Sequence, residues 1–373
     1  MSKRTDTVWE AAPHTVAKIT MLGHYLFVWF SVLGTTFRGR DLWYIDGFAG
    51  PGEYTNFSSG SPRAAIKAAE AALQNPQWKA GKIRCFFIEE NKARFAHLSQ
   101  LVAGLTIDKR VTVQIFLGTF VEGIEWLKSQ TVNPFASDNP VFSFIDPFGT
   151  RGLWFEAVSD LLSRPSCEVL INFDSDGVSR VLKAGEDANH VENLNRLFGT
   201  STWQEELDVG LGLTMLSRKA VDFYLRLLRD LPKVDYAFPF EMTSKKGLVN
   251  YHLVFASQHP KGLQKMKESM RKIDQSGEFT FCDAHVGQQN LFSTDNMSFY
   301  ARQLSEKFRG RTVSYPEIER FALNESPFLN CKAMLRTLEE SGMIEVTCNK
   351  PRRRVGTFPD GSSISVRFIG GGA

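Results

Sequence analysis

The stretch Tyr44-Ile45-Asp46-Gly47-Phe48-Ala49-Gly50-Pro51-Gly52-Glu53-Tyr54 decides the fold class of this chain. The apolar run from Leu42 to Ile45 ends in Asp46, and three glycines follow within six residues. In open α/β sheets, nucleotides bind where a buried parallel strand runs into a glycine-rich turn, because a backbone without side chains lets the ligand approach closely. The stretch therefore predicts a nucleotide-binding site at the end of the first strand.

Residues beside the glycines exclude two common nucleotide loops. Gly52 is followed by Glu53 rather than by the lysine of an ATP-type phosphate loop, and Thr55 stands where a dinucleotide-binding loop has its third glycine. The remaining pattern, D-x-F-x-G-x-G, resembles the adenosylmethionine loop of class I methyltransferases, especially those that act on nucleic acid.

This resemblance implies that S-adenosylmethionine (SAM) is the cofactor. The residues that it implies for binding are Asp46, Phe48, Ala49, Gly50 and Gly52. In such a loop Asp46 would accept a hydrogen bond from the ammonium group of the cofactor or from a fixed water. Alternatively, Asp46 only caps the loop and the glycines form a tight turn.

Length and composition predict a two-domain, soluble protein. The chain has 373 residues and a net charge of only +3, so a nucleic-acid surface would have to be local. Five scattered cysteines without a C-x-x-C pair disfavour a structural zinc or iron–sulfur site, and the histidines have no ligand spacing, so we assign no metal. The cysteine usage fits a reducing cytoplasm. No signal pattern and no apolar run near the ~20 residues of a membrane span is evident, so we expect a cytoplasmic protein without membrane contact.

Strand and helix signals alternate through residues 1–272, which we assign to one α/β domain. Apolar runs predict five strands, at 42–45, 83–88, 111–116, 141–145 and 168–173, with helices between them. Residues 175–235 predict a helical insertion, and 238–243 and 249–256 predict an antiparallel hairpin, followed by a helix over 261–272. Repeated β-α units predict a parallel sheet with helices on both faces. With the edge hairpin, this Rossmann-like order resembles the class I methyltransferase architecture more than the NAD-binding one.

A polar segment, 273–295, predicts a linker before a small domain over 296–373. Three expected helices (297–308, 315–323 and 327–341) and two expected strands (343–348 and 364–369) resemble a winged helix in their order. Four cations lie between the two strands, at Lys350, Arg352, Arg353 and Arg354. On a wing they would contact a phosphate backbone. Alternatively, the basic loop is only solvated, or the domain binds a protein.

Glu89 ends the second apolar run, where class I methyltransferases place an acid that accepts both ribose hydroxyls of the cofactor. We choose Glu89 over Glu90, because successive side chains of a strand point in opposite directions. A surface charge at a strand end is the alternative. The third strand ends in Leu117-Gly118-Thr119, without the acid that many of these enzymes use for adenine, and Thr119 is expected to cap a helix.

The fourth strand ends in Asp146-Pro147-Phe148-Gly149, where amino-group methyltransferases carry a [DNS]-P-P-[YFW] motif. An exocyclic amino group is a poor nucleophile because its lone pair is conjugated with the ring. Asp146 and the carbonyl of Pro147 would accept its two hydrogens, and the ring of Phe148 would stack on the base. The second proline is missing here, and a strand-terminal turn with a core phenylalanine is the alternative. No cysteine follows Asp146 closely, which disfavours a cytosine-carbon methyltransferase.

Several segments together resemble the bacterial three-Cys-motif partner family. They are His14-Thr15 with Lys18, the stretch 44–54, Gly60-Ser61-Pro62, Phe87-Ile88-Glu89, Phe144–Gly149 and Tyr251–Ser257. The resemblance covers about residues 14–272 and implies association with a radical-type, three-cysteine protein that acts on nucleic acid. His14 and Lys18 lie four residues apart on one helix face, where they would cover the cofactor or hold an acidic partner.

Two functions follow from this combination. The first is SAM-dependent methyl transfer to an amino group of nucleic acid. The second is a non-catalytic partner subunit that keeps the methyltransferase fold, binds nucleic acid or SAM, and presents substrate to the radical-type enzyme. The loop at Asp46 and the acid at Glu89 favour the enzyme, whereas the missing acid after the third strand and the incomplete D-P-P-Y motif favour the partner subunit.

Overall fold

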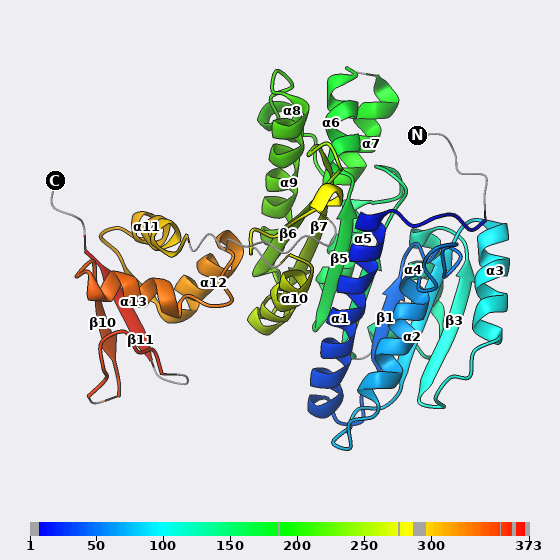
Figure 1. Ribbon diagram of the computed structural model, residues 1–373, viewed down its shortest axis with the longest axis horizontal. Helices are drawn as coiled ribbons and strands as arrows, with labels where there is room; N and C mark the ends of the chain where they lie inside the picture. Colours follow the sequence, from blue (N-terminus) through cyan, green and yellow to red (C-terminus); the bar gives the residue numbers. More distant parts are fainter. Residues whose placement is uncertain are drawn as a thin grey trace. The chain divides into compact units, whose positions relative to one another are not determined.

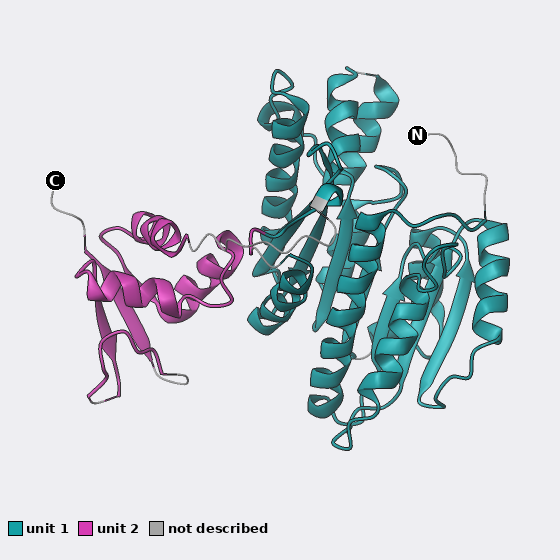
Figure 2. Cartoon of the chain, in the orientation of Figure 1, with its two compact units in different colours: residues 1–274, 279–288 teal, residues 275–278, 289–373 magenta. Residues whose placement is uncertain are grey.

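A computed structural model describes residues 7–136, 138–185, 187–274, 277–285, 296–350, 352–359 and 363–369. The chain divides into two units, residues 1–274 with 279–288 and residues 275–278 with 289–373 (Figure 2). The sequence places the linker between its two domains at 273–295.

An eight-stranded, mostly parallel sheet forms the centre of unit 1 (Figure 1). Its strand order is β3-β2-β1-β4-β5-β7-β6-β8. All neighbours pair in parallel except β7, which is antiparallel to both β5 and β6. The prediction of an α/β fold, with a parallel sheet that finishes in an antiparallel hairpin, is confirmed. The strands are β1 (Leu42–Asp46), β2 (Ile83–Glu89), β3 (Val111–Leu117), β4 (Val141–Ile145), β5 (Cys167–Phe173), β6 (Tyr236–Thr243), β7 (Val249–Ser257) and β8 (Thr280–Cys282).

Helices cover both faces of the sheet, as the alternation of strands and helices predicts. One face carries α1 (Pro13–Thr36), α2 (Ser61–Ala72) and α10 (Pro260–Ile273), which pack along one another in Figure 1. The other face carries α4 (Phe120–Ser129), α5 (Phe155–Leu162) and α9 (Leu213–Arg229), whose apolar side chains share a core with the strands. The remaining helices are α3 (Lys92–Ala103), α6 (Ser175–Lys183), α7 (Ala188–Phe198) and α8 (Trp203–Glu206).

The expected caps fix where the site-bearing helices begin. The side chain of Asn91 accepts hydrogen bonds from the backbone N–H groups of Ala93 and Arg94 at the start of α3. Thr119 and Glu122 form the complete capping box of α4, which satisfies two N–H groups that a helix start leaves unpaired. Thr119 therefore caps its helix, as the sequence predicts.

Strand β8 is a difference from the sequence prediction, which places residues 280–282 in a linker. The three residues pair in parallel with β6 and extend the sheet by one strand. A three-residue strand is too short to show the alternation or the apolar run by which a strand is recognised in a sequence. Its position matters because it brings the following residue, Asp283, to the start of α1, within 2.8 Å of His14.

Of the described helices, α1 is long and apolar enough to cross a membrane by length and composition. A count of uninterrupted apolar residues misses this, because polar residues are scattered along the helix. Its side chains Leu22, Tyr25, Leu26 and Phe30 are buried within unit 1, and the Tyr25 ring contacts rings of the sheet. These contacts make α1 a core helix of unit 1.

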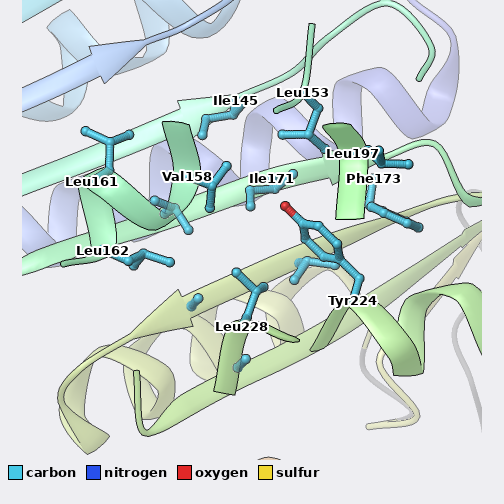
Figure 3. Close-up of a cluster of buried hydrophobic side chains, with 14 of the residues drawn as sticks. Ile145, Leu153, Val158, Leu161, Leu162, Ile171, Phe173, Leu197, Tyr224 and Leu228 are labelled. Atoms are coloured by element: carbon cyan, nitrogen blue, oxygen red, sulfur yellow. The ribbon is translucent and has the colours of Figure 1, made fainter. Parts of the chain in front are cut away.

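A fully buried carboxylate ties α1 to the sheet and to the start of α10. Glu168 on β5 accepts a hydrogen bond from the Tyr25 hydroxyl (2.6 Å) and another from the Ser257 hydroxyl (2.7 Å). Burial raises the pKa of Glu168, and the two hydroxyls counteract that rise by bonding to the charged form. On the opposite face of the sheet, Tyr224 is equally buried among apolar side chains (Figure 3), but its hydroxyl has no hydrogen-bond partner in the described part of the chain.

Unit 2 has its own core around three helices and a three-stranded antiparallel sheet. The helices are α11 (Met297–Lys307), α12 (Tyr315–Glu325) and α13 (Lys332–Glu340), and the sheet order is β10-β11-β9. Its strands are β9 (Thr312–Ser314), β10 (Ile344–Cys348) and β11 (Ile364–Phe368). The expected three helices and hairpin are present, while β9 is too short for the sequence to indicate. Helix α13 begins at Lys332, later than the predicted 327.

The two buried tyrosines of unit 1 give a matched test of this packing. Tyr25→Phe removes one donor from a buried carboxylate, and we expect it to lower the free energy of unfolding by about 1–3 kcal/mol. Tyr224→Phe removes a buried hydroxyl that has no described partner. We therefore expect the free energy of unfolding to stay the same or to rise by less than about 1 kcal/mol. Denaturant titration of both variants measures the difference. Equal losses would contradict the role given to the Tyr25–Glu168 hydrogen bond.

Candidate functional site

Four acidic residues meet at one edge of the large sheet, because the carboxyl ends of parallel strands lie together there. Asp46 ends β1, Glu89 ends β2, Asp146 directly follows β4, and Asp174 directly follows β5. The sequence singled out the first three. Asp174 was missed, because its position in the sequence, as the cap of α6, gives it an ordinary structural role.

The glycine-rich loop lies against the ends of β1 and β2. Gly50 and Gly52 have φ values of 64° and 86°, in the left-handed region that favours glycine. A Cβ atom on Gly47 would approach the Phe120 ring to 2.7 Å, and one on Gly60 would approach the backbone of Gly52 to 2.6 Å. At Gly50 a Cβ atom would meet nothing within 4 Å. A side chain at Gly50 would therefore enter open space, while Gly47 and Gly60 are required for packing.

Glu89 connects this loop to helix α3. One of its carboxylate oxygens accepts from the backbone N–H of Gly50 (2.8 Å), and the other accepts from that of Asn91 (2.7 Å). Burial raises the pKa of Glu89, whereas these backbone hydrogen bonds and the charge of Arg94 act in the opposite direction. Each carboxylate oxygen has a second lone pair, so Glu89 can still accept from a ligand's hydroxyl groups.

A pocket opens between the ends of β1, β2 and β3, beside the glycine-rich loop. Two of the predicted cofactor residues, Phe48 and Glu89, line it together with Phe148 from the loop after β4. Asp46, Ala49, Gly50 and Gly52 do not line it; Ala49 is buried and donates its N–H to the carbonyl of Ile88. The other lining residues are Gly47, Ile88, Glu90, Gly118, Thr119 and Phe120.

Asp46 is completely buried beneath the loop. Its carboxylate accepts from the Tyr44 hydroxyl (3.2 Å) and from the backbone N–H of Phe48 (3.4 Å). Burial raises the pKa of Asp46 to about 7; a hydrogen bond with Ser61 opposes the rise, and the charge of Asp146 adds to it. The contact with Phe48 is the loop-capping role that the sequence left open as an alternative.

The carboxylate of Asp146 is occupied by two partners that the sequence did not pair with it. Lys18 of α1 donates to one oxygen at 2.5 Å, and the side chain of Asn172 on β5 donates to the other at 2.5 Å. The Lys18 side chain is only 7% exposed, and its ammonium group lies 5.4 Å from the centre of the Tyr251 ring. A substrate amino group that donates a hydrogen bond to Asp146 would therefore share the carboxylate with Lys18 and Asn172 or displace one of them.

His14 and Lys18 both hold acidic partners, which is one of the two roles that their spacing suggested. His14 contacts Asp283 through Nδ1 at 2.8 Å, one helical turn before the Lys18–Asp146 ion pair. Tyr251 lies beside both, with its hydroxyl 3.4 Å from the His14 carbonyl oxygen. The segment Tyr251–Ser257 was noted in the sequence, but no pattern connected it with α1.

The two residues after Asp146 differ in exposure. Pro147 is buried, whereas the Phe148 side chain is 57% exposed at the rim of the pocket. This excludes the alternative in which Phe148 is a core residue. Its ring contacts Trp9 and the guanidinium group of Arg94, two residues that the sequence did not single out.

A second polar network lies on the opposite face of the sheet. His252 contacts the Ser175 hydroxyl through Nδ1 (2.8 Å) and the Glu241 carboxylate through Nε2 (3.4 Å), and Arg218 donates twice to Glu241. The order resembles a nucleophile–base–acid relay, but Ser175 is fully buried, so a substrate has no access to it. Among the described residues no group of three or more histidine, cysteine or acidic side chains could hold a metal ion.

The four cations of unit 2 are not equivalent. Lys350, Arg352 and Arg354 are exposed in the loop between β10 and β11. Arg353 instead forms a largely buried ion pair with Glu339 of α13, and Glu339 also accepts from the backbone N–H of Gly356. Arg353 therefore holds the loop against the helix, so its guanidinium group is already engaged where a phosphate contact was predicted.

Comparisons with known proteins give only distant likenesses. No protein-family model matches the sequence, and no curated protein matches it. An O-methyltransferase from Bacillus cereus, solved with SAH, is 14% identical over 66% of this chain and 82% of its own, with a TM-score of 0.37. The O-methyltransferase TomG from Streptomyces achromogenes, solved with SAM, is 14% identical over 67% and 92%, with a TM-score of 0.35.

Trm1 from Pyrococcus horikoshii, solved with S-adenosyl-L-methionine, is 10% identical over 98% of this chain and 93% of its own, with a TM-score of 0.36. The structural neighbours thus include class I methyltransferases that bind SAM or SAH. At such low identities and TM-scores the likeness carries no argument about activity. Function has to be inferred from the geometry of this chain.

The buried Asp46 makes the free energy of unfolding depend on pH. Its pKa of about 7 in the folded protein exceeds the ordinary value of 3.8, so this group stabilises the fold below about pH 4, and the stabilisation is lost as the pH rises through 7. Between pH 5 and 8 we expect the free energy of unfolding to fall by roughly 3 kcal/mol more in the wild type than in Asp46→Asn. Denaturant titrations across this range measure it. Parallel curves for the two proteins would show that Asp46 is ionised throughout.

Proposed function

We propose that the protein is a SAM-dependent methyltransferase that acts on an amino group of nucleic acid. The observation that carries the proposal is Glu89, a carboxylate in the wall of the pocket that accepts from the backbone N–H of Gly50, where no side chain stands. A carboxylate that still has free lone pairs, next to a backbone without side chains, fits a ribose with two adjacent hydroxyls.

The cofactor's other contacts follow from the same edge of the sheet. Phe48, Phe120 and Gly118 line the pocket where a planar base would lie, and no acid stands at the end of β3 to accept from its amino group. Asp46 lies beneath the loop and would face the methionine end. When bound, the cofactor supplies an electrophilic methyl group on a sulfonium sulfur.

The acceptor would lie at the end of β4. Asp146 and the carbonyl of Pro147 accept the hydrogens of the amino group, which localises the nitrogen lone pair toward the methyl donor. The exposed ring of Phe148 offers a surface on which a base can stack. Lys18 and Asn172 hold the carboxylate of Asp146 in place from the sides of α1 and β5.

Unit 2 is proposed to be a winged helix that contacts the nucleic-acid backbone. Its three exposed cations, Lys350, Arg352 and Arg354, lie on the loop of its β-hairpin, and Arg353 keeps that loop folded through Glu339. Such contacts are independent of sequence, so this unit would position the substrate, while the base is selected at the Phe148 edge.

A non-catalytic partner subunit is the second candidate. The observation in its favour is that both oxygens of Asp146 already have donors at 2.5 Å. In that case the protein would bind SAM or nucleic acid and present substrate to a radical-type three-cysteine protein in the cytoplasm, as the resemblance to the three-Cys-motif partner family implies.

Cofactor binding is tested first, by calorimetry with SAM. Gly50→Arg places a long side chain in the open space of the loop, so we expect binding to be lost. Gly39→Arg is the matched control, because Gly39 also has a positive φ (72°) with nothing near its missing Cβ, but lies before β1 at the opposite edge of the sheet. The control should bind as the wild type does. Absence of binding by the wild type would sink the cofactor assignment.

Methyl transfer is then measured with labelled SAM and with DNA, RNA and protein acceptors. We expect Asp146→Ala to reduce transfer by about 100-fold while SAM binding is kept, because the variant lacks the side-chain acceptor for one of the two hydrogens of the amino group. Asp176→Ala, which removes only an ion pair within α6, should leave transfer unchanged. Full activity of Asp146→Ala would remove Asp146 from the chemistry. A wild type that binds SAM but methylates none of these acceptors would favour the partner subunit.

A further inference from the structure

The chain before α1 runs across the glycine-rich loop and is fastened to it. We call residues 7–12 the strap. The carbonyl of Trp9 accepts from the backbone N–H of Thr55 (3.0 Å). The backbone of Ala11 makes two hydrogen bonds with the Asn56 side chain, at 2.7 and 3.0 Å. These hydrogen bonds tie the strap to the loop at Thr55 and Asn56, and they must break when the strap separates from it.

The Trp9 side chain of the strap packs with Arg94 and Phe148 at the pocket, and we call these three side chains the stack. The Arg94 guanidinium carbon lies 4.9 Å from the centre of the Trp9 ring and 4.8 Å from that of Phe148. The two rings also contact each other edge to face, with centroids 6.0 Å apart. A guanidinium group close to two aromatic rings is a favourable cation–π arrangement.

This stack stands at the rim of the cofactor pocket. Phe148 lines the pocket together with Glu89, and the charge of Arg94 acts on Glu89. Just after the strap, the first turn of α1 carries His14, and the next turn carries Lys18, which holds Asp146. One continuous segment therefore reaches from the cofactor pocket to the proposed acceptor position.

The pocket is too small for the proposed cofactor while the stack is in place. It encloses about 10 Å³, which is room for about one water molecule. Pockets for ligands of this size usually enclose about 300–1,000 Å³. Entry therefore requires a wall to move, and Phe148 is an exposed lining side chain that contacts the strap.

We propose that the strap and Arg94 form a movable cover of the cofactor pocket, which blocks the pocket while the Trp9–Arg94–Phe148 stack is formed and admits the cofactor when the stack separates. The inference rests on the proposed function, since it takes SAM as the ligand of this pocket. Arg94 is then a positioning residue: it holds the cover through the two rings and is not required to touch the reacting atoms.

Stopped-flow fluorescence with SAM tests the cover. Arg94→Ala weakens the closed state, which competes with binding, so we expect the association rate to rise by about five- to tenfold and the dissociation rate to stay unchanged. A side chain that only contacts bound ligand would change dissociation alone. Arg94→Lys keeps the charge near Glu89 but loses the planar group. Its association rate should lie between those of Arg94→Ala and the wild type.

Two controls keep the result interpretable. Arg40→Ala removes an arginine that packs on Phe37 at the opposite edge of the sheet, and its rates should equal those of the wild type. Trp9→Phe keeps a ring in the stack and removes the fluorophore, so it shows which part of the signal comes from the strap. Equal melting temperatures of Arg94→Ala and the wild type exclude a folding defect.

The possible failures are distinguishable. An association rate that Arg94→Ala leaves unchanged, in a protein that binds SAM, would overturn the cover and leave the proposed function intact. A wild type that does not bind SAM would overturn the proposed function and the cover together. Equal acceleration by Arg40→Ala would also overturn the cover, because the effect would then not depend on the stack.

Discussion

Compensation of negative charge at the carboxyl edge of the sheet is the constraint on which the site depends. Parallel strands bring Asp46, Glu89, Asp146 and Asp174 to one edge, and buried carboxylates without partners are costly. Each is compensated differently. Asp46 has a raised pKa, Glu89 accepts two backbone N–H groups, Asp146 is held by Lys18 and Asn172, and Asp174 caps α6.

These differences divide the edge into two regions with different chemistry. The end of β2 offers a carboxylate that accepts from two backbone N–H groups in the wall of a pocket, and this suits a neutral polar ligand such as a sugar. The end of β4 has a carboxylate with a cation already beside it. Helix α1 supplies that cation, so a helix that is apolar enough to resemble a membrane span also completes the polar site.

The fold was largely predictable because its signals are local. Apolar runs indicated the five parallel strands, and their ends located Asp46, Glu89 and Asp146, which the parallel arrangement brings to one edge. The partners of these acids were not predictable from one sequence. Lys18 and Asp146 are 128 residues apart, and no spacing rule relates them. The three-residue strands β8 and β9 were missed for lack of pattern, and the role of Arg353 depends on Glu339 in a separate helix.

The raised pKa of Asp46 has a consequence for any cationic ligand that binds beside it. At neutral pH this carboxyl group is close to half protonated, since its pKa is about 7. A positive charge brought near it stabilises the ionised form, so binding would expel a proton into solvent. Affinity for such a ligand would then be thermodynamically linked to pH, and the heat of binding would depend on the ionisation enthalpy of the buffer.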